Sequence, residues 1–553
     1  MLAGSTAVSG TRAERVPAGG PFRRAREAAL AHRFRLGVGA VTGAVAAFLL
    51  VQFRAWPPHE DETLVLFLSR QPLADFYDGV IRERSGAPLH FLLAHVVESL
   101  APGLTALRLI SVVTAVASIP VIAALAARLA GRRVALLATL FAAASWITLF
   151  HGVYGRMYGL FLLTSSLCFL AFLRAVERSD RRSWALWLAA AVALVATQPY
   201  GALVLGAQGV YLLARRGDGF RARPAAIAFA SAVVLAAPLW FLYWRLAGRF
   251  DVGLTGNGSK LGSPLEVLLY FGKVVGDFTA GWPPALALVG LVTLLGFVSL
   301  ARSRPAVAVL VGAVFAVPAA ALLAARSGAS VTLESRHLIF ALPFFATALA
   351  AGVLRGARLL GAYGRVALPV AVASLVAGQI AWGWQKTPAL YQGEHPIRKD
   401  ARAQAAAWLA ATSRPDDLFF GYEPLFLDAW EQGADVRLIV QRADPSLALK
   451  TVREAAKPLG RGVWVFDATD HADVARQRLS IPRRSPGPAF ETKAFGPFLV
   501  IRTREPVRTI ETFFYETAKV QMLSRELGVG DAGINHQTVL TVLYRLHDFD
   551  PKR

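Results

Sequence analysis

Runs of about 20 apolar residues, separated by short polar clusters, recur through roughly the first 390 residues of the chain. The hydrocarbon core of a membrane is about 30 Å thick, and a helix of about 20 apolar residues crosses it. Of the 553 residues, 55% are hydrophobic and only 17% are charged. We therefore predict a polytopic α-helical membrane protein with about eleven spans, at 36–53, 106–127, 134–152, 157–173, 184–197, 199–214, 224–244, 284–301, 306–325, 337–354 and 366–384.

The net charge of +22 comes from Lys and Arg residues that cluster between the apolar runs. This pattern is typical of cytoplasmic loops, and no basic face carrying aromatic residues indicates nucleic-acid binding. We expect residues 1–35 to be a basic cytoplasmic tail and the C-terminus to lie outside a bacterial-type plasma membrane. This topology requires that segment 87–100 does not cross the membrane, and we expect an interfacial or re-entrant helix there. The segments predicted outside are 54–105, 152–157, 245–283 and 326–336.

After about residue 390 the long apolar runs stop and charged residues return. Short β-type and helix-type segments alternate there, which predicts a small soluble α/β domain over residues 391–553. No catalytic signature is visible in it, and we interpret it as a structural or acceptor-guiding cap. The expected strands are 417–421, 436–440, 462–466 and 498–502, and the expected helices are 399–412, 446–459, 472–479 and 509–527.

The acidic sequence His59-Glu60-Asp61-Glu62 follows the first predicted span. Ionisable groups at a membrane boundary indicate function, although a solvated acidic turn would have the same composition. Arg156 opens a later span from the predicted outer face, against the positive-inside rule, and Arg336 does the same. Arginine recognises phosphate well, so both are candidates for an anion site. The alternatives are snorkelling of Arg156 to lipid headgroups and a local surface pair of Glu334 with Arg336.

These residues belong to a series of short motifs that resembles the GT-C class of bacterial membrane glycosyltransferases. The most similar group is the family-39-like mannosyltransferases and aminoarabinose transferases. The resemblance covers about residues 36–390. Its motifs are Asp61-Glu62, Ala87-Pro88-Leu89-His90-Phe91-Leu92-Leu93, Ala106 to Leu109, Arg156-Met157-Tyr158, Thr197 with Tyr200, and Arg336 to Pro343.

The resemblance implies transfer of one sugar, with inversion, from a polyprenyl-phosphate donor to an acceptor hydroxyl of a lipid, glycan or protein. Asp61 would be the base, since a carboxylate can accept the hydroxyl proton, and Glu62 would orient the acceptor or the loop. Arg156 and Arg336 would hold the donor phosphate and stabilise its developing charge. Further candidates for substrate contacts are His59, Tyr154, Tyr158, Tyr200, Lys273 and Glu334.

The sequence departs from the family at Tyr154, where relatives often carry an acidic residue that can help to bind a metal. The resemblance allows a divalent metal cofactor, but Tyr154 supplies no acidic ligand for one. The single cysteine, Cys168, excludes an intramolecular disulfide and a Cys-based metal site. The alternative function is that of a transporter or flippase for lipid-linked sugars. Transporters carry charged or broken helices at mid-membrane in paired halves, whereas the ionisable residues here gather at one face.

Overall fold

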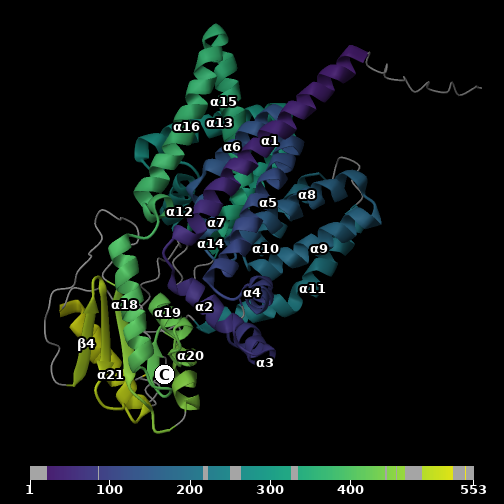
Figure 1. The fold of residues 1–553 in the computed structure, drawn as a ribbon. Coiled ribbons are helices and arrows are strands. Elements are labelled where there is room, and N and C mark those ends of the chain that lie inside the picture. Colours follow the sequence, from purple (N-terminus) through teal and green to yellow (C-terminus); the bar gives the residue numbers. More distant parts are fainter. Residues whose placement is uncertain are drawn as a thin grey trace, which may run out of the picture.

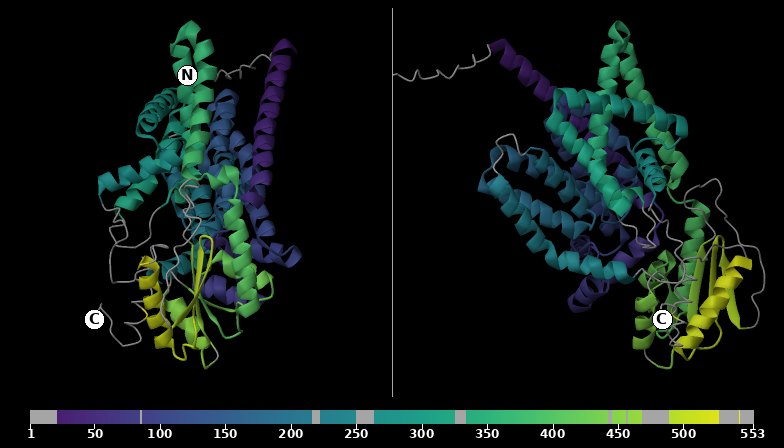
Figure 2. Two further views of the ribbon diagram at one scale, coloured as in Figure 1. Left: turned by 60° about the vertical axis from the view of Figure 1, so that its left-hand side comes forward. Right: turned by 180° about the vertical axis from the view of Figure 1, so that it is seen from behind.

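The computed structural model describes residues 21–84, 86–215, 222–249, 263–324, 334–441, 445–455, 457–467, 489–526 and 542. A large helical domain is followed by a smaller α/β domain, which lies beneath it in Figure 1. The N-terminal helix and the hairpin of the last two long helices project at the opposite end (Figures 1 and 2). The prediction of a polytopic helical membrane protein with a small C-terminal α/β domain is confirmed.

Every predicted span is helical in the structure. Within the described residues, eight helices are long and apolar enough to cross a membrane, and nine if the bent pair α6–α7 counts as one broken span. Two predicted spans, α9 and α10, have only 17 and 14 residues, which makes them short for a bilayer. The helices are α1 (Pro21–Ala55), α5 (Leu104–Ala130), α6 (Arg132–Ala144), α7 (Trp146–Val153), α8 (Tyr158–Arg178), α9 (Arg181–Thr197), α10 (Gly201–Ala214), α11 (Ala222–Arg249), α13 (Pro283–Ser303), α14 (Pro305–Ala324), η2 (Ser335–Ala341) with α15 (Leu342–Leu359), η3 (Gly361–Tyr363) and α16 (Gly364–Lys386).

The first helix begins earlier than the hydrophobic pattern predicts. α1 starts at Pro21, inside the segment 1–35 that we predicted to be a tail. Proline is favoured in the first turn of a helix, and the following Arg- and Ala-rich residues are good helix formers. Helix formation therefore continues beyond the apolar stretch that marks the span.

The segment 54–105 folds into short helices at the end of the helical domain nearest the α/β domain. They are α2 (Glu60–Ser69), α3 (Leu73–Tyr77), the π-helix η1 (Asp78–Arg84) and α4 (Pro88–Leu100). Helix α4 has 13 residues and, like α10, is short for a bilayer, so its non-spanning position stays a prediction. The predicted loop 245–283 contains α12 (Pro264–Phe278), which was not predicted, and its residues 250–262 lie outside the described part.

The helical core is built around α5 and α15. Helix α5 packs against α1, α6, α7 and α8, and α15 is buried from Leu342 to Val353 between α13, α6 and α5. Helices α13 and α15 cross at Gly296 and Gly352. A Cβ atom on Gly352 would stand 1.9 Å from the carbonyl oxygen of Val292, so only glycine permits this crossing. Such close approach through small residues is how membrane helices maximise their packing.

The α/β domain has a five-stranded sheet in the order β2-β1-β3-β5-β4. Strands β2, β1 and β3 are parallel, and β5 runs antiparallel to β3 and β4. Residues alternate between two cores: Phe419 and Val463 pack under α18 and α19, whereas Leu418 and Trp464 pack under α20 and α21. The elements are α17 (Ala389–Gln392), α18 (Pro396–Thr412), β1 (Leu418–Phe420), α19 (Pro424–Glu431), β2 (Leu438–Val440), α20 (Pro445–Glu454), β3 (Gly462–Asp467), β4 (Phe490–Phe495), β5 (Phe498–Thr503) and α21 (Ile510–Glu526).

The four predicted strands are present, while β4 and α19 were not predicted. Strand β4 is an edge strand with only one buried residue, Phe490, so it lacks the apolar run by which a buried strand is recognised. The predicted helix at 472–479 lies outside the described residues.

Candidate active site

The acidic sequence after the first span forms the N-terminus of helix α2. The ring Nδ1 of His59 accepts a hydrogen bond from the backbone N–H of Asp61 at 3.2 Å. The Glu62 carboxylate accepts from the backbone N–H of His59 at 3.1 Å, which completes a capping box. This motif satisfies N–H groups that the first turn of a helix leaves unpaired. The local sequence thus fixes where α2 begins and how Asp61 is presented.

Glu62 is fully buried and forms an ion pair with Arg108 of helix α5. Nε and Nη2 of Arg108 donate to the two carboxylate oxygens at 2.8 and 2.7 Å. The same guanidinium donates to the carbonyl oxygens of Phe53, Trp56 and Pro57, so all five of its N–H groups are used. Glu62 also accepts the N–H of Gly155 at 2.7 Å. This arrangement ties the loop before α2 and the Gly155 turn to α5.

Asp61, one residue earlier, is partly exposed and meets different partners. The hydroxyl of Tyr154 donates to its Oδ2 at 2.7 Å, and Nε of Arg156 lies 3.8 Å from the same oxygen. Burial acts to raise the pKa of Asp61, but the charges of Arg156 and Arg336 and the hydrogen bond from Tyr154 hold this pKa well below its ordinary value. Asp61 is therefore a carboxylate at neutral pH.

Arg336 approaches the same group from the start of the η2–α15 span. Its guanidinium lies 5.1 Å from the ring centroid of Tyr158, and its Nη2 donates to Glu334 at 2.9 Å. The charge of Arg336 acts on Asp61 and also on Arg156. The Nε atoms of Arg156 and Arg336 are both buried and make no hydrogen bond with the described residues. Two guanidiniums with unused donors beside one carboxylate make a site suited to an anion.

The remaining predicted residues lie at the edge of this group. The ring of Tyr200 stacks on His337 at a centroid distance of 4.6 Å, and His337 lies 6.3 Å from Tyr158. Lys273 is exposed on α12 and makes no hydrogen bond or ion pair with the described residues. The structure thus joins His59, Asp61, Tyr154, Arg156, Tyr158 and Arg336, with Glu334 and Tyr200 beside them and Lys273 farther out.

No protein-family model matches the sequence, and no curated protein matches it significantly. Among solved structures, the apo form of ArnT from Cupriavidus metallidurans matches at a TM-score of 0.50 and 16% identity, covering 85% of this chain and 98% of ArnT. The GT-C fold is therefore present in this chain. AglB oligosaccharyltransferase from Archaeoglobus fulgidus, solved with an inhibitory peptide and a dolichol-phosphate, matches at 0.45 and 12%, covering 93% and 86%. Mycobacterial arabinofuranosyltransferase AftD matches at 0.42 and 15%, covering 85% and 40%.

A second buried network lies beside Arg336, and the sequence did not predict it. Asp277, at the end of α12, accepts hydrogen bonds from Ser335 and from Lys386 at the end of α16. The ammonium of Lys386 also lies 3.5 Å from the ring centroid of Trp146. Asp277 thereby fixes Ser335, the residue next to Arg336. Asp277 and Lys386 could have been found in the sequence because each is an ionisable residue at the edge of an apolar helix. Arg108, in the first turns of α5, has the same kind of position.

The residues at the site do not fit a divalent metal. Within the described part of the chain, no three His, Cys, Asp or Glu side chains are grouped as metal ligands. Asp61 already accepts from Tyr154, and Glu62 is saturated by Arg108, His59 and Gly155. Tyr154 therefore supplies a hydrogen-bond donor at a position where an acidic side chain would supply a metal ligand. No step of the chemistry is assigned to a metal.

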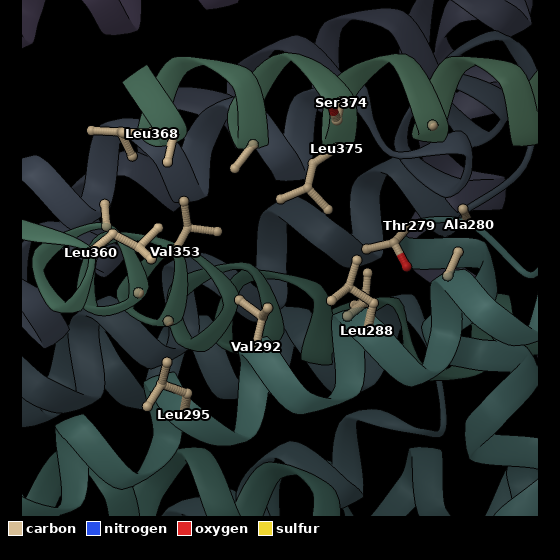
Figure 3. Close-up of a pocket in the computed structure, with 18 of the residues that line it drawn as sticks. Thr279, Ala280, Leu288, Val292, Leu295, Val353, Leu360, Leu368, Ser374 and Leu375 are labelled. Carbon is tan, nitrogen blue, oxygen red and sulfur yellow. The ribbon is translucent and has the colours of Figure 1, made fainter. Parts of the chain in front are cut away.

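An apolar cavity of about 480 Å³ lies between α13, α15 and α16 in this GT-C fold. Its walls carry aliphatic side chains such as Leu288, Val292, Val353 and Leu375 (Figure 3). One end reaches Leu360, and the other reaches Thr279, two residues beyond the buried Asp277. The cavity is suited to a hydrocarbon chain whose polar end would lie towards the Asp277 network.

Proposed function

We propose that this protein transfers one sugar from a polyprenyl-phosphate carrier to an acceptor hydroxyl at the outer face of the membrane. The observation that carries the proposal is the convergence of Asp61 with two arginines, Arg156 and Arg336, that come from distant spans. A partly exposed carboxylate beside unused guanidinium donors supplies the two functions that glycosyl transfer from a lipid phosphate requires. The GT-C fold, shared with apo ArnT, adds support.

The reaction is a single displacement at the anomeric carbon. The acceptor oxygen forms the new bond to this carbon while its proton passes to the Asp61 carboxylate. The bond from the anomeric carbon to the phosphate oxygen breaks, and the electron pair leaves with polyprenyl phosphate. Because attack and departure occur on opposite faces, the configuration inverts. Arg156 and Arg336 stabilise the charge that grows on the departing phosphate.

Glu62 acts as a positioning residue in this proposal. Its carboxylate is fully buried and fully bonded, so it reaches neither sugar nor acceptor. It orients the loop, which is one of the two roles expected from the resemblance.

The membrane orientation follows from the ends of the spans. Helices α5, α8 and α15 begin near the site, and their other ends carry Arg128, Arg178 and Arg358. Basic residues stay on the cytoplasmic side, so the site and the α/β domain belong outside and the N-terminus inside. The lipid chain of the donor would occupy the cavity between α13, α15 and α16 in part, and the donor would never leave the bilayer.

The test is transfer of label from a radiolabelled polyprenyl-phosphate sugar in proteoliposomes. Wild-type protein and the control Asp75→Asn, an exposed carboxylate on α3, should both form product. Asp61→Asn should lose a factor of about 10² to 10⁴ in kcat, since a general base contributes that much. Equal transfer by Asp61→Asn would remove the base assignment. Movement of intact donor between leaflets without product would establish a flippase instead.

A further inference from the structure

Helix α2, which presents Asp61, is held at its far end by the α/β domain. Just beyond the helix, Nε of Arg70 donates to Glu98 of α4 at 2.7 Å, and Nη2 donates to Glu431 of α19 at 2.9 Å. The Arg70 guanidinium lies 5.0 Å from the ring centroid of Trp430. Phe67 packs against Trp430 and Tyr422 at centroid distances of 5.8 and 5.7 Å.

The loop that leads into α2 is held by the same domain. The carbonyl oxygen of Ala55 accepts the backbone N–H of Glu394 at 2.7 Å. Gly393 has a φ of +78°, and a Cβ atom there would stand 2.9 Å from the Cβ of Ala55. The Glu394 carboxylate is fixed by Arg398 and Arg402. Both arginines lie on α18, so this second attachment belongs to the body of the α/β domain.

Residues 55–70 are therefore attached to the α/β domain at both ends, with the Glu62–Arg108 pair as their fixed point in the helical domain. A helix of ten residues does not hold its position without tertiary contacts. The contacts of Asp61 with Tyr154 and Arg156 require that position to be kept within a fraction of an ångström.

We propose that the α/β domain is a positioning element that aligns Asp61, and that Trp430 and Glu431 are its positioning residues. This inference rests on the proposed function. It gives the domain a role in the transfer step, beyond the structural or acceptor-guiding cap that we expected from its sequence. A displacement of about 1 Å at a reacting group can reduce the rate by about 10².

The experiment uses the full-length protein with Trp430→Ala and Glu431→Gln combined. Two single variants serve as controls. Trp430→Phe keeps an aromatic ring against Phe67 and Arg70, and Asp435→Asn alters a surface pair with Arg437 in the same domain. We expect the double variant to lose about tenfold or more in kcat while the KM for the labelled donor stays within about twofold. Trp430→Phe and Asp435→Asn should behave like wild type.

Hydrogen exchange of the α2 amides gives a readout that does not need activity. Peptides covering residues 60–69 should exchange faster in the double variant than in wild type, while peptides from α5 should not change. Faster exchange with an unchanged kcat would overturn the positioning role and leave the proposed function standing. Unchanged exchange would overturn the role whatever the activity. If wild-type protein transferred no sugar, the proposed function would fail, and the exchange result would still decide whether the domain holds α2.

Discussion

The hydroxyl of Tyr154 donates a 2.7 Å hydrogen bond to the carboxylate of Asp61, 93 residues earlier in the chain. Because burial and the charge of Asp61 raise the pKa of Tyr154 well above its ordinary value, the phenol keeps its proton and remains a donor. The hydrogen bond orients the carboxylate and stabilises its ionised form. This contact distinguishes the site from relatives that carry an acidic residue at this position.

Substitution Tyr154→Phe should move the acid limb of the rate profile to higher pH. The active form of Asp61 is the carboxylate, and its pKa is held low, so wild-type activity persists into acid. Loss of a hydrogen bond to a charged group, about 1.5–3 kcal/mol, corresponds to a rise of about one to two pH units. The pH dependence of kcat/KM measures this, with Tyr363→Phe, at a largely exposed tyrosine, as the control. An unshifted acid limb would show that the bond does not tune Asp61.

Removal of either arginine should slow transfer far more than removal of an arginine at the other end of the spans. We expect Arg156→Ala and Arg336→Ala to lose about 10² to 10³ in kcat, as when a donor to a developing charge is deleted. Arg302→Ala, at the exposed end of α13, is the matched control and should change little. Comparable losses in all three variants would refute the phosphate assignment. Single-turnover rates with labelled donor separate this effect from donor binding.

The buried pair of Glu62 and Arg108 should dominate the stability of this end of the helical domain. Arg108→Ala leaves a buried carboxylate without its partner, which costs about 3–5 kcal/mol. Arg128→Ala, on the same helix, breaks a partly exposed pair with Glu177 and a 3.5 Å hydrogen bond to the carbonyl oxygen of Leu170, and should cost about 1 kcal/mol or less. Thermal unfolding in detergent compares the two. A similar melting temperature for both variants would contradict this account.

Chelation should leave transfer intact. Among the described carboxylates of the site, Asp61 accepts from Tyr154, Glu334 pairs with Arg336, and Glu62 is saturated by its buried partners. Tyr154 occupies the position where relatives often carry an acid. Activity after dialysis against a chelator should therefore equal that of untreated protein. If chelation abolished activity and a divalent cation restored it, the site would bind a metal through ligands that the structure does not bring together.

The crossing of α13 and α15 should tolerate no side chain at Gly352. A methyl group there would meet the carbonyl oxygen of Val292, whereas one at Gly356 would meet nothing within 4 Å. Gly352→Ala should lower the unfolding temperature by several degrees, because the helices must separate or the backbone must strain, a cost of about 1–3 kcal/mol. Gly356→Ala, one turn away on the same helix, should be neutral. Equal melting of both variants would contradict the close crossing.

The sequence by itself determined the helical membrane architecture and the small C-terminal α/β domain, and it marked Asp61, Arg156 and Arg336 as candidates. These predictions depend on local rules, namely the length of apolar runs, the alternation of short segments and the charges at the ends of spans. Helix α12 was missed although its sequence carries a capping box of Ser263 and Glu266 before an apolar segment. The edge strand β4 carries no apolar run by which it could be recognised.

Only the tertiary structure decided which of two adjacent acids is buried. The resemblance assigned Asp61 as the base and Glu62 as an orienting residue, but the local pattern does not give their burial, and neighbouring residues on a helix point about 100° apart. That rotation sends Glu62 into the core against Arg108 and leaves Asp61 beside Tyr154 and Arg156. The partners come from other helices, far along the chain. Their meeting depends on how the spans pack, and a residue pattern within one segment carries no information about it.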